Sequence, residues 1–471
     1  MSKFNLKKML KLGICGLLTT SIFTFSSVST THAADVPEQL PSYKTVTEAF
    51  DWGPAISKLV VNLGQPVNIN QVDKNSFRVH VKRILPDGSI TIAEALRRSN
   101  PNNTVLGTES KSDADLEGDV IITDAYVSDE NGNRSYVRGN YVTIELKVAP
   151  NYVLTSPLNF DLNTFFNSWV DSQYTITASR IGNVANVVVN NKQGNIRPQA
   201  DKFNYGAYSI PFATDPANAG FNDSMAFASY EPKDNLKHPL IVWLHGGGEG
   251  GTEPTLPIMG NKAVEFAEDS IQHYFGGAYV LAPQARNFWM LSYGDQGMTF
   301  ADRNAVYSHT LLGLIKKYAE EHPGVDTSRI YIGGDSNGGY MTLVMIRDNP
   351  GFFAAAFPTC EGLADSIITK SDLRAIAQTP TWFIAAKTDT TLPPDKYVVP
   401  TYNRLRNIGA DVHFSFFDRI VDETGLYTND DGSAYEYPGH WSWIYVYNDR
   451  CEEVIDGVNT KLFQWMANQH R

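Results

Sequence analysis

The sequence has few cysteines and almost no long apolar segments. Only three of its 471 residues are cysteine, which excludes a fold held by a dense disulfide framework. Beyond the first 25 residues, no apolar run approaches the roughly 20 residues that a membrane-spanning helix needs, so we expect no membrane span there. Charged residues make up 19% and hydrophobic residues 42%, which is typical of globular proteins rather than disordered ones.

The sequence also lacks an excess of positive charge. There are 39 Lys and Arg against 51 Asp and Glu, a formal net charge of −12. Four lysines and no acid lie in the first 34 residues, so the remainder carries −16. An acidic body of this size repels a phosphate backbone, and we therefore expect no nucleic-acid partner.

The first 34 residues are organised like an export signal. A basic stretch ending at Lys11 precedes an apolar run from Leu12 to Phe25, and Ala33 and Ala34 suit cleavage by a signal peptidase. The apolar run is shorter than a membrane anchor requires. We expect a signal peptide over residues 1–34 and a secreted, extracellular protein.

Two cysteines remain after removal of that signal, Cys360 and Cys451. An oxidising compartment permits a disulfide between them, and two buried free thiols are the alternative. Neither cysteine has the spacing of a metal site. The sequence leaves the pairing open.

Residues 35–192 have the pattern of an all-β domain. Short runs rich in β-branched and aromatic residues, such as Leu59–Leu63, recur between turn signals. Asn131-Gly132 supplies the positive φ that a hairpin turn needs between strands expected at Ile121–Val127 and Tyr136–Val148. This pattern predicts an immunoglobulin-like β-sandwich. The segment has no cluster of catalytic residue types, so we expect a structural or docking module.

Residues 193–471 have a different pattern, after a polar segment at 190–204 that we interpret as a linker. Apolar runs of four to seven residues alternate with amphipathic stretches such as 304–321. The expected strands are Leu240–Leu244, Ala278–Ala282, Ile330–Ile332, Ala354–Phe357, Thr381–Ala386 and Val412–Phe417. Such alternation predicts an α/β fold with a doubly wound, mostly parallel sheet, whose chemistry lies beyond the carboxyl ends of the strands.

The strongest motif is Gly334-x-Ser336-x-Gly338, which follows an apolar strand and precedes a helical stretch. This is the pattern of a nucleophile elbow, in which a serine sits on a strained strand-to-helix turn. Glycines flank the serine because side chains there would collide where strand and helix approach. We expect Ser336 to be the nucleophile and the backbone N–H of Asn337 to face the developing oxyanion.

A second glycine-rich loop, His245 to Gly251, follows the buried strand 240–244. In this architecture the loop donates the other oxyanion N–H, and we expect Gly247 to be the donor, with Gly248 as second choice. His245 precedes the nucleophile in the chain, so we expect it to brace the loop rather than act as a base.

Serine nucleophiles need a base, and in this fold the chain order is serine, acid, histidine. Three histidines follow Ser336. His413 lies inside an expected strand and His470 is next to the last residue. His440 lies in a turn that leads into a helix, so we expect it to be the general base.

The acid should follow the strand before the histidine loop. Asp389 stands three residues after the expected strand 381–386. Asp365, after the preceding strand, is the runner-up, and Asp395 is third. We expect Asp389 to orient the base.

Together these residues resemble a secreted α/β-hydrolase carboxylesterase of the prolyl-oligopeptidase-like type with an N-terminal immunoglobulin-like domain. The resemblance is carried by 245–251, by Ala282-Pro283-Gln284, by the elbow, by the Asp389 loop and by 439–443. The family's acid loop often has a histidine four residues before the aspartate, where this chain has Ala385. The resemblance implies hydrolysis of carboxylic esters, often short-chain, with no metal or organic cofactor.

Several questions stay open at this stage. The same residues would serve a prolyl-oligopeptidase-type peptidase, a polyester depolymerase, or a feruloyl or acetyl esterase acting on extracellular polymers. Trp289, Tyr293, Trp441 and Trp443 are candidates to line a substrate pocket, with core packing as the alternative. The first domain could restrict the cleft or join copies into a homo-oligomer.

Overall fold

The computed structural model describes residues 40–84, 117–161, 164–179, 181, 186–209, 224–291 and 305–471. The expected signal peptide, residues 1–34, lies outside the described residues. Residues 40–471 form one unit by their contacts.

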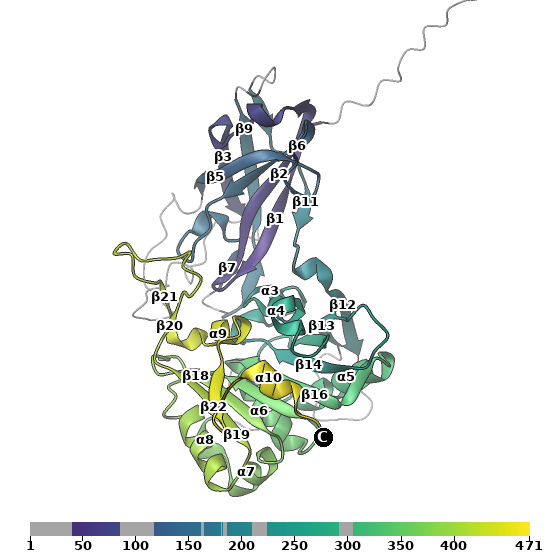
Figure 1. The fold of residues 1–471 in the computed structure, drawn as a ribbon, viewed down its shortest axis with the longest axis vertical. Coiled ribbons are helices and arrows are strands. Elements are labelled where there is room, and N and C mark those ends of the chain that lie inside the picture. Colours follow the sequence, from purple (N-terminus) through teal and green to yellow (C-terminus); the bar gives the residue numbers. More distant parts are fainter. Residues whose placement is uncertain are drawn as a thin grey trace, which may run out of the picture. The chain divides into compact units, whose positions relative to one another are not determined.

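The first part of the chain is a β-sandwich. One sheet has the order β11-β1-β2-β6-β5 and the other has the order β10-β9-β3-β4 (Figure 1). The strands are β1 (Ser42–Phe50), β2 (Gly53–Val67), β3 (Phe77–Ile84), β4 (Glu117–Asp119), β5 (Ile122–Ser128), β6 (Gly139–Leu146), β9 (Asp171–Ala178), β10 (Val187–Val189) and β11 (Lys192–Ile196). The predicted all-β sandwich is confirmed.

Alternation along the strands builds the sandwich core. Phe77, Val79 and Val81 of β3 are buried at every second position, and they cluster with Val142 and Ile144 of β6 in the facing sheet. Arg78, His80 and Lys82 occupy the positions between them and after them, as a strand with one wet face requires. Hydrophobic burial between the two sheets therefore holds this domain together.

The segment 190–204 is more than the linker that its polarity predicts. Lys192–Ile196 forms β11, which pairs in parallel with β1 and so extends the first sheet beyond residue 192. A short 3-10 turn at Ala200–Lys202 follows, and β12 (Asn204–Ser209) begins the next sheet. The polar side chains of β11 fit an edge strand, where half of the groups face solvent.

The second part is an eight-stranded sheet of order β12-β13-β15-β14-β16-β17-β18-β19. Its remaining strands are β13 (Ser224–Tyr230), β14 (His238–Leu244), β15 (Tyr279–Gln284), β16 (Val325–Asp335), β17 (Ala355–Thr359), β18 (Thr381–Ala386) and β19 (Val412–Phe417). Strands β14 to β19 are parallel, and β12 and β13 form an antiparallel edge.

Helices cover both faces of this sheet. Along β14, Leu240, Val242 and Leu244 join one buried cluster, whereas Ile241 and Trp243 join the other. The first cluster includes side chains of α5 (Ser308–Glu321), α6 (Asn337–Asp348), α7 (Lys370–Ile376) and α8 (Val398–Asn407). The second includes side chains of α9 (Trp443–Tyr447) and α10 (Leu462–Ala467). The predicted doubly wound α/β fold is confirmed.

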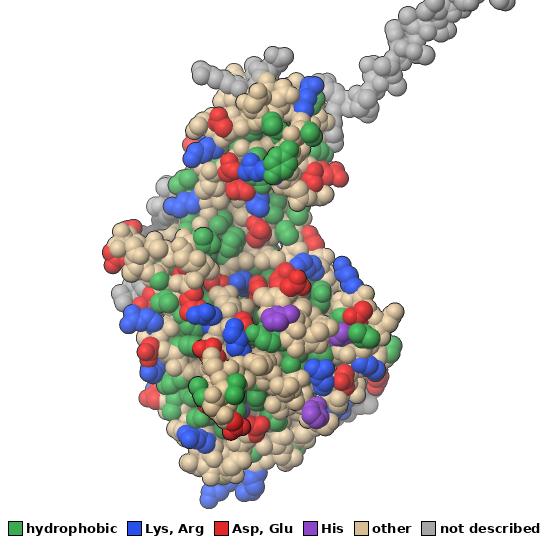
Figure 2. All heavy atoms as spheres, in the orientation of Figure 1, with side chains coloured by type: hydrophobic (Ala, Val, Ile, Leu, Met, Phe, Trp, Pro, Cys, Tyr) green, Lys and Arg blue, Asp and Glu red, His purple; other side chains and the backbone are tan. Residues whose placement is uncertain are grey.

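The face of the molecule shown in Figure 2 carries both acidic and basic side chains. On the face that Figure 2 shows, acidic and basic side chains are interspersed among polar and apolar ones. Within the described residues, no helix has the length and apolarity to cross a membrane. The same part of the chain has no group of three or more His, Cys, Asp or Glu residues placed to hold a metal.

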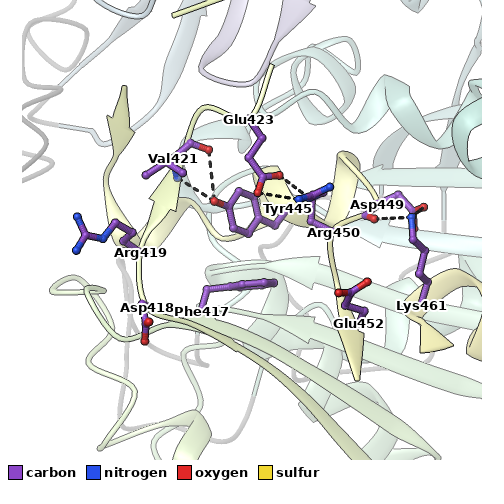
Figure 3. A pocket seen from close by; sticks show the side chains of 10 residues that line it. All are labelled: Phe417, Asp418, Arg419, Val421, Glu423, Tyr445, Asp449, Arg450, Glu452 and Lys461. Atoms are coloured by element: carbon purple, nitrogen blue, oxygen red, sulfur yellow. Dashed lines mark hydrogen bonds and ion pairs between the residues drawn. The ribbon is translucent and has the colours of Figure 1, made fainter. Parts of the chain in front are cut away.

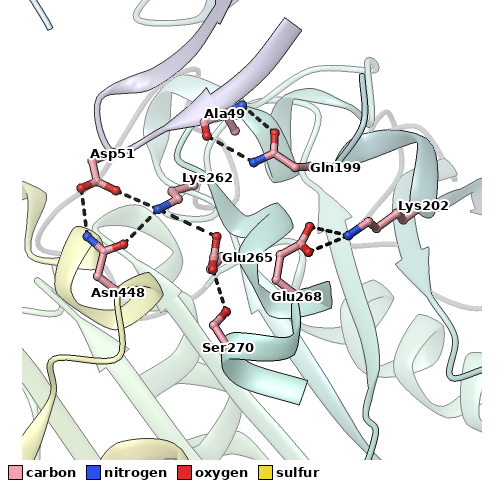
Figure 4. Close-up of polar contacts among 9 residues, drawn as sticks. All are labelled: Ala49, Asp51, Gln199, Lys202, Lys262, Glu265, Glu268, Ser270 and Asn448. Carbon is pink, nitrogen blue, oxygen red and sulfur yellow. Dashed lines mark hydrogen bonds and ion pairs between the residues drawn. The ribbon is translucent and has the colours of Figure 1, made fainter. Parts of the chain in front are cut away.

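A partly buried ion pair joins the β1–β2 turn to the second domain (Figure 4). Lys262 Nζ lies 2.9 Å from Asp51 Oδ1, and the side chains of these residues are 16% and 5% exposed. Asn448, just after α9, bonds to both residues. A second ion pair, Lys202 with Glu268, is largely solvent-exposed at its lysine.

Replacing Lys262 should therefore destabilise the protein more than replacing Lys202. We expect Lys262→Ala to lower the free energy of unfolding by about 2 kcal/mol, because the Asp51 carboxylate stays buried without a cation. Lys202→Ala should cost less than about 1 kcal/mol, since water screens that pair. Urea unfolding of both variants measures the contrast, and equal effects would contradict it.

Candidate active site

The carboxyl ends of four neighbouring strands bring the expected site residues to one edge of the sheet. In register, Leu244 at the end of β14 pairs with Gly334 of β16, and Asp335 pairs with Thr359 at the end of β17. Thr359 in turn pairs with Ile384 of β18. The loops that follow these strands therefore start side by side, as Ser336 and Asp389 require.

Ser336 lies on a strained turn between β16 and α6. Its backbone has φ 54° and ψ −110°, outside the regions that a non-glycine residue prefers. Its N–H donates to the carbonyl of Thr359, which fixes the turn against β17. Such strain persists only where the surroundings impose it, so the fold holds this serine in an unusual position.

The two glycines of the motif are required by a close approach of backbones. A Cβ at Gly338 would stand 1.9 Å from the carbonyl oxygen of Leu244, and one at Gly334 would stand 2.5 Å from the same oxygen. Because the obstacle is strand β14 rather than a movable side chain, neither position has room for a larger residue. The motif thus allows helix α6 to start directly against the sheet.

A chain of hydrogen bonds connects the three expected catalytic residues. The Nε2 atom of His440 lies 2.9 Å from Ser336 Oγ, and Nδ1 lies 2.8 Å from Asp389 Oδ2. Asp389 and His440 are 4% and 7% exposed. The imidazole is thus positioned to accept the serine proton at Nε2 while donating Nδ1–H to the carboxylate.

The backbone holds the acid in place. Asp389 Oδ1 accepts hydrogen bonds from the N–H groups of Thr391 and Leu392, both at 2.9 Å. The loop of His440 packs directly on this loop, since a Cβ at Gly439 would stand 2.4 Å from Thr388. Both partners are therefore oriented by their surroundings and not only by each other.

His245 braces the glycine-rich loop after β14. Its Nδ1–H donates to the carbonyl of Gly246 at 2.6 Å, and its Nε2 accepts the N–H of Ala285 at 3.0 Å. Burial lowers the pKa of His245 to about 4, so the ring is neutral at physiological pH. Both ring nitrogens are used by the backbone, which agrees with the expected bracing function.

The expected oxyanion donors are backbone N–H groups within this loop and at the start of α6. Gly247 and Gly248 keep partial exposure, whereas His245 and Gly246 are buried. Asn337 is the first residue of α6, where a helix leaves its N–H without an intrahelical acceptor. Its side-chain oxygen accepts the N–H of Trp289 at 2.6 Å, which ties α6 to the loop after β15.

The aromatic pocket candidates have different environments. Trp289 is fully buried, its indole N–H donates to the carbonyl of His245, and so it packs under the loop instead of lining an open cleft. Trp441 follows His440 in the chain and is half-buried. The centroid of its ring lies 6.1 Å from that of the buried Trp443 ring. Tyr293 lies outside the described residues.

The alternative acids and bases have other partners. Asp365 pairs with Arg404 at 2.7 Å, and Asp395 is exposed. His413 of β19 bonds to Glu453 of β22 (Glu452–Ile455), and His470 is exposed near the C-terminus. None of these residues belongs to the hydrogen-bonded chain at Ser336.

Cys360 and Cys451 are both free and buried. Of the two alternatives that the sequence allowed, the structure has the free thiols. Burial raises the pKa of each thiol well above its ordinary value, so both are protonated at neutral pH. Unreactive thiols are consistent with simple packing.

Two buried carboxyl groups lie next to the site, within its two glycine-rich motifs, and neither has a role that the motifs predict. Glu249 lies in the glycine-rich loop, and Asp335 immediately precedes Ser336. They are 3% and 0% exposed. Residue type gave no signal of their burial, because glutamate and aspartate in loops are usually solvated. Only their position beside the glycine-rich motifs could have indicated a role.

A polar pocket of about 370 Å³ lies beside β19 and α9 (Figure 3). It includes none of the expected site residues. Charged side chains that line it form ion pairs with one another: Arg450 pairs with Glu423, and Lys461 pairs with Asp449. The pocket therefore offers little free charge for a ligand.

Two family descriptions match the chain on either side of the domain boundary. Residues 42–186 match the Esterase Ig-like N-terminal domain. Residues 309–414, which contain Ser336 and Asp389, match the Prolyl oligopeptidase family. The chain is a serine hydrolase with an esterase-type immunoglobulin-like domain. The resemblance to an α/β-hydrolase esterase with an N-terminal immunoglobulin-like domain is confirmed.

Solved structures resemble this serine hydrolase over different shares of its length. A thermostable esterase is similar over 91% of this chain and 100% of its own, with a TM-score of 0.67 and 22% identity. An acylaminoacyl peptidase from Pyrococcus horikoshii covers 52% of this chain and 40% of its own, at 16% identity and a TM-score of 0.35. A ferulic acid esterase matches 46% of this chain and 90% of its own chain, at 13% identity and a TM-score of 0.33. No curated protein matches the sequence.

Proposed function

We propose that this serine hydrolase is a secreted esterase that cleaves short-chain or aryl carboxylic esters through an acyl-enzyme. The observation that carries the proposal is the unbroken hydrogen-bonded chain from Asp389 through His440 to Ser336. The strained backbone of Ser336 supports it, because elbow turns of this kind present a nucleophile to a cleft.

The first half of the proposed reaction forms the acyl-enzyme. Ser336 Oγ attacks the ester carbonyl while Nε2 of His440 takes its proton, and Asp389 stabilises the resulting imidazolium. The N–H groups of Asn337 and Gly247 donate to the oxyanion of the tetrahedral intermediate, each worth about 3 kcal/mol in the transition state. The alcohol leaves with the proton from His440.

The second half releases the acid. Water enters the place of the alcohol, His440 takes a proton from it, and the hydroxide attacks the acyl carbon. The same N–H donors bind the second oxyanion. Collapse of this intermediate returns the proton to Ser336, so the enzyme is regenerated with no other cofactor in these steps.

Ester rather than amide hydrolysis is favoured by the first domain, because its family description is that of esterases. The match of residues 309–414 to the prolyl oligopeptidase family makes peptide cleavage the second candidate. Parallel assays with p-nitrophenyl butyrate and a proline p-nitroanilide separate the two. We expect kcat/KM to be at least about 100-fold higher for the ester, since amides need protonation of a poorer leaving group. Cleavage of the amide alone would support the peptidase.

Export is proposed from the first 34 residues alone, where a basic stretch precedes a short apolar run. The measurement is the N-terminal sequence of the protein recovered from the culture medium. Export and cleavage as proposed give a chain that begins at Asp35. Retention of the uncleaved chain inside the cells would contradict it.

A further inference from the structure

Two buried acids connect the glycine-rich loop to the nucleophile elbow. The amide nitrogen of Asn261 donates to Glu249 Oε2 at 3.3 Å and to Asp335 Oδ2 at 3.0 Å, so the two carboxyl groups face the same point. A Cβ at Gly246 would stand 2.6 Å from Asp335 Oδ2 and 3.1 Å from Glu249 Oε2. The acids thus fill the space directly beneath the loop that carries Gly247.

Among the described residues, the surroundings of these acids contain amides but no compensating cation. Asn167 Nδ2 donates to Glu249 Oε1 at 2.9 Å, and Asp335 Oδ1 is buried with no hydrogen-bond partner in the part of the chain that the structure describes. The titratable neighbours are Tyr447 of α9 and Cys360 after β17, which burial keeps neutral. No described Lys, Arg or His acts on the pKa of either acid. Two adjacent negative charges without a cation are strongly unfavourable in such a site.

We propose that Glu249 and Asp335 share one proton, and that this singly charged pair positions the oxyanion loop against the nucleophile elbow. The inference rests on the proposed function, because it assigns the pair to the same site. One proton on the pair removes the repulsion between two buried charges, so that Asn261 can join the loop to β16 through its hydrogen bonds to both acids. Both acids are therefore positioning residues rather than catalytic ones.

The immunoglobulin-like domain completes this arrangement. Asn167 belongs to β8 (Asn167–Trp169), which pairs with β7 (Leu158–Phe160) in a hairpin of that domain. A Cβ at Gly248 would stand 2.7 Å from Asn167 Nδ2, so the asparagine reaches into the loop itself. It supplies the donor for the second oxygen of Glu249. The first domain thereby contributes to the geometry of the site.

The sign of the pH dependence follows from burial. Burial raises the pKa of Glu249 to about 7 and raises the pKa of Asp335 well above its usual range. The folded protein therefore keeps the shared proton at pH values above 4.5, the ordinary pKa of glutamate, where the unfolded chain has released it. This contribution to stability is present at acidic pH and is lost as the pH rises through about 7.

The test compares Glu249→Gln with the wild type in the mature, full-length protein. The amide is close in shape to the carboxyl group and cannot become charged, so the pair then holds no second negative charge at any pH. We expect the melting temperature of the wild type to fall between pH 4.5 and pH 7 and above, and that of Glu249→Gln to fall less. We also expect Glu249→Gln to keep more of its kcat for p-nitrophenyl butyrate at alkaline pH. Glu253→Gln, a carboxyl-to-amide change at an exposed position of the same loop, should follow the wild type.

Asn167→Leu tests the contribution of the first domain. Loss of the donor to Glu249 should lower kcat by roughly tenfold at neutral pH, with KM changed less than about twofold, because the oxyanion loop acts mainly on the transition state. The midpoint of the alkaline loss of kcat should move to higher pH, since the removed amide favours the charged form of Glu249. A merely structural change would lower stability without moving that midpoint.

Identical pH profiles of stability and kcat in Glu249→Gln and wild type would overturn the inference. If Glu249→Gln does not fold, Asp335→Asn provides the same comparison, and infrared difference spectra of the wild type show whether a carboxyl group is protonated at neutral pH. The proposed function fails separately: a wild type that neither hydrolyses esters nor reacts with a fluorophosphonate would contradict it. The pH slope of unfolding would still report on the acid pair.

Discussion

Replacing Ser336 by alanine should lower kcat for p-nitrophenyl butyrate by roughly 10⁴- to 10⁶-fold. The hydroxyl that accepts the acyl group is lost, whereas the loop and the fold are left in place. His440→Ala should cost a similar factor, and the double variant should be little worse than either, because the residues act as a unit. Steady-state kinetics on the three variants measure the losses.

The control for this prediction is a histidine outside the hydrogen-bonded chain. His413 of β19 bonds to Glu453 of β22, and His413→Ala should keep kcat close to that of the wild type. Labelling with a fluorophosphonate should occur in the wild type and in His413→Ala but not in Ser336→Ala. Labelling of Ser336→Ala would place the nucleophile at another residue.

Gly338→Ala should be among the most destabilising single substitutions in the second domain. The added methyl group would stand 1.9 Å from the carbonyl oxygen of Leu244 and 2.7 Å from that of His245. Both obstacles are backbone atoms, one of them in the central strand β14, so relief requires moving α6 away from the sheet. We expect a loss of roughly 3 kcal/mol or more in the free energy of unfolding. Urea unfolding of the soluble fraction measures it.

Gly194→Ala is the matched control for that substitution. A Cβ at Gly194, in the edge strand β11, would meet no atom within 4 Å. We expect a change in unfolding free energy within about 0.5 kcal/mol of zero, because nothing has to move. Equal losses in the two variants would show that the close approach at Gly338 is not what constrains the position.

The residues of the candidate site could largely be predicted, because each of them is marked by a short stretch of sequence. Gly334-x-Ser336-x-Gly338 marks a turn whose geometry only small residues permit, and the structure has Ser336 at φ 54° there. The order of the fold then restricts the base to histidines after the serine. His440 and Asp389, both placed in loops after apolar segments, lie in the hydrogen-bonded chain with Ser336.

Features that depend on distant pairing could not be predicted in the same way. The edge strand β12 is polar and short, and only its antiparallel pairing with β13 reveals it as part of the sheet. Burial of Trp289 under His245 depends on how two loops pack, which no local pattern shows. Glu249 and Asp335 are 86 positions apart in the chain and meet only through Asn261. Their sequence neighbours give no sign of that contact.

The hairpin β7–β8 has a consequence for how this chain can be recombined. Phe166 stacks on Phe288 with ring centroids 4.9 Å apart, and the indole N–H of Trp169 donates to Thr255. A first domain grafted from a relative would bring a foreign hairpin to these positions. We expect such chimaeras to retain their catalytic rate only when the donor hairpin restores both the aromatic stack and the amide at 167. The sequences of the two domains are therefore expected to change together at these contact positions.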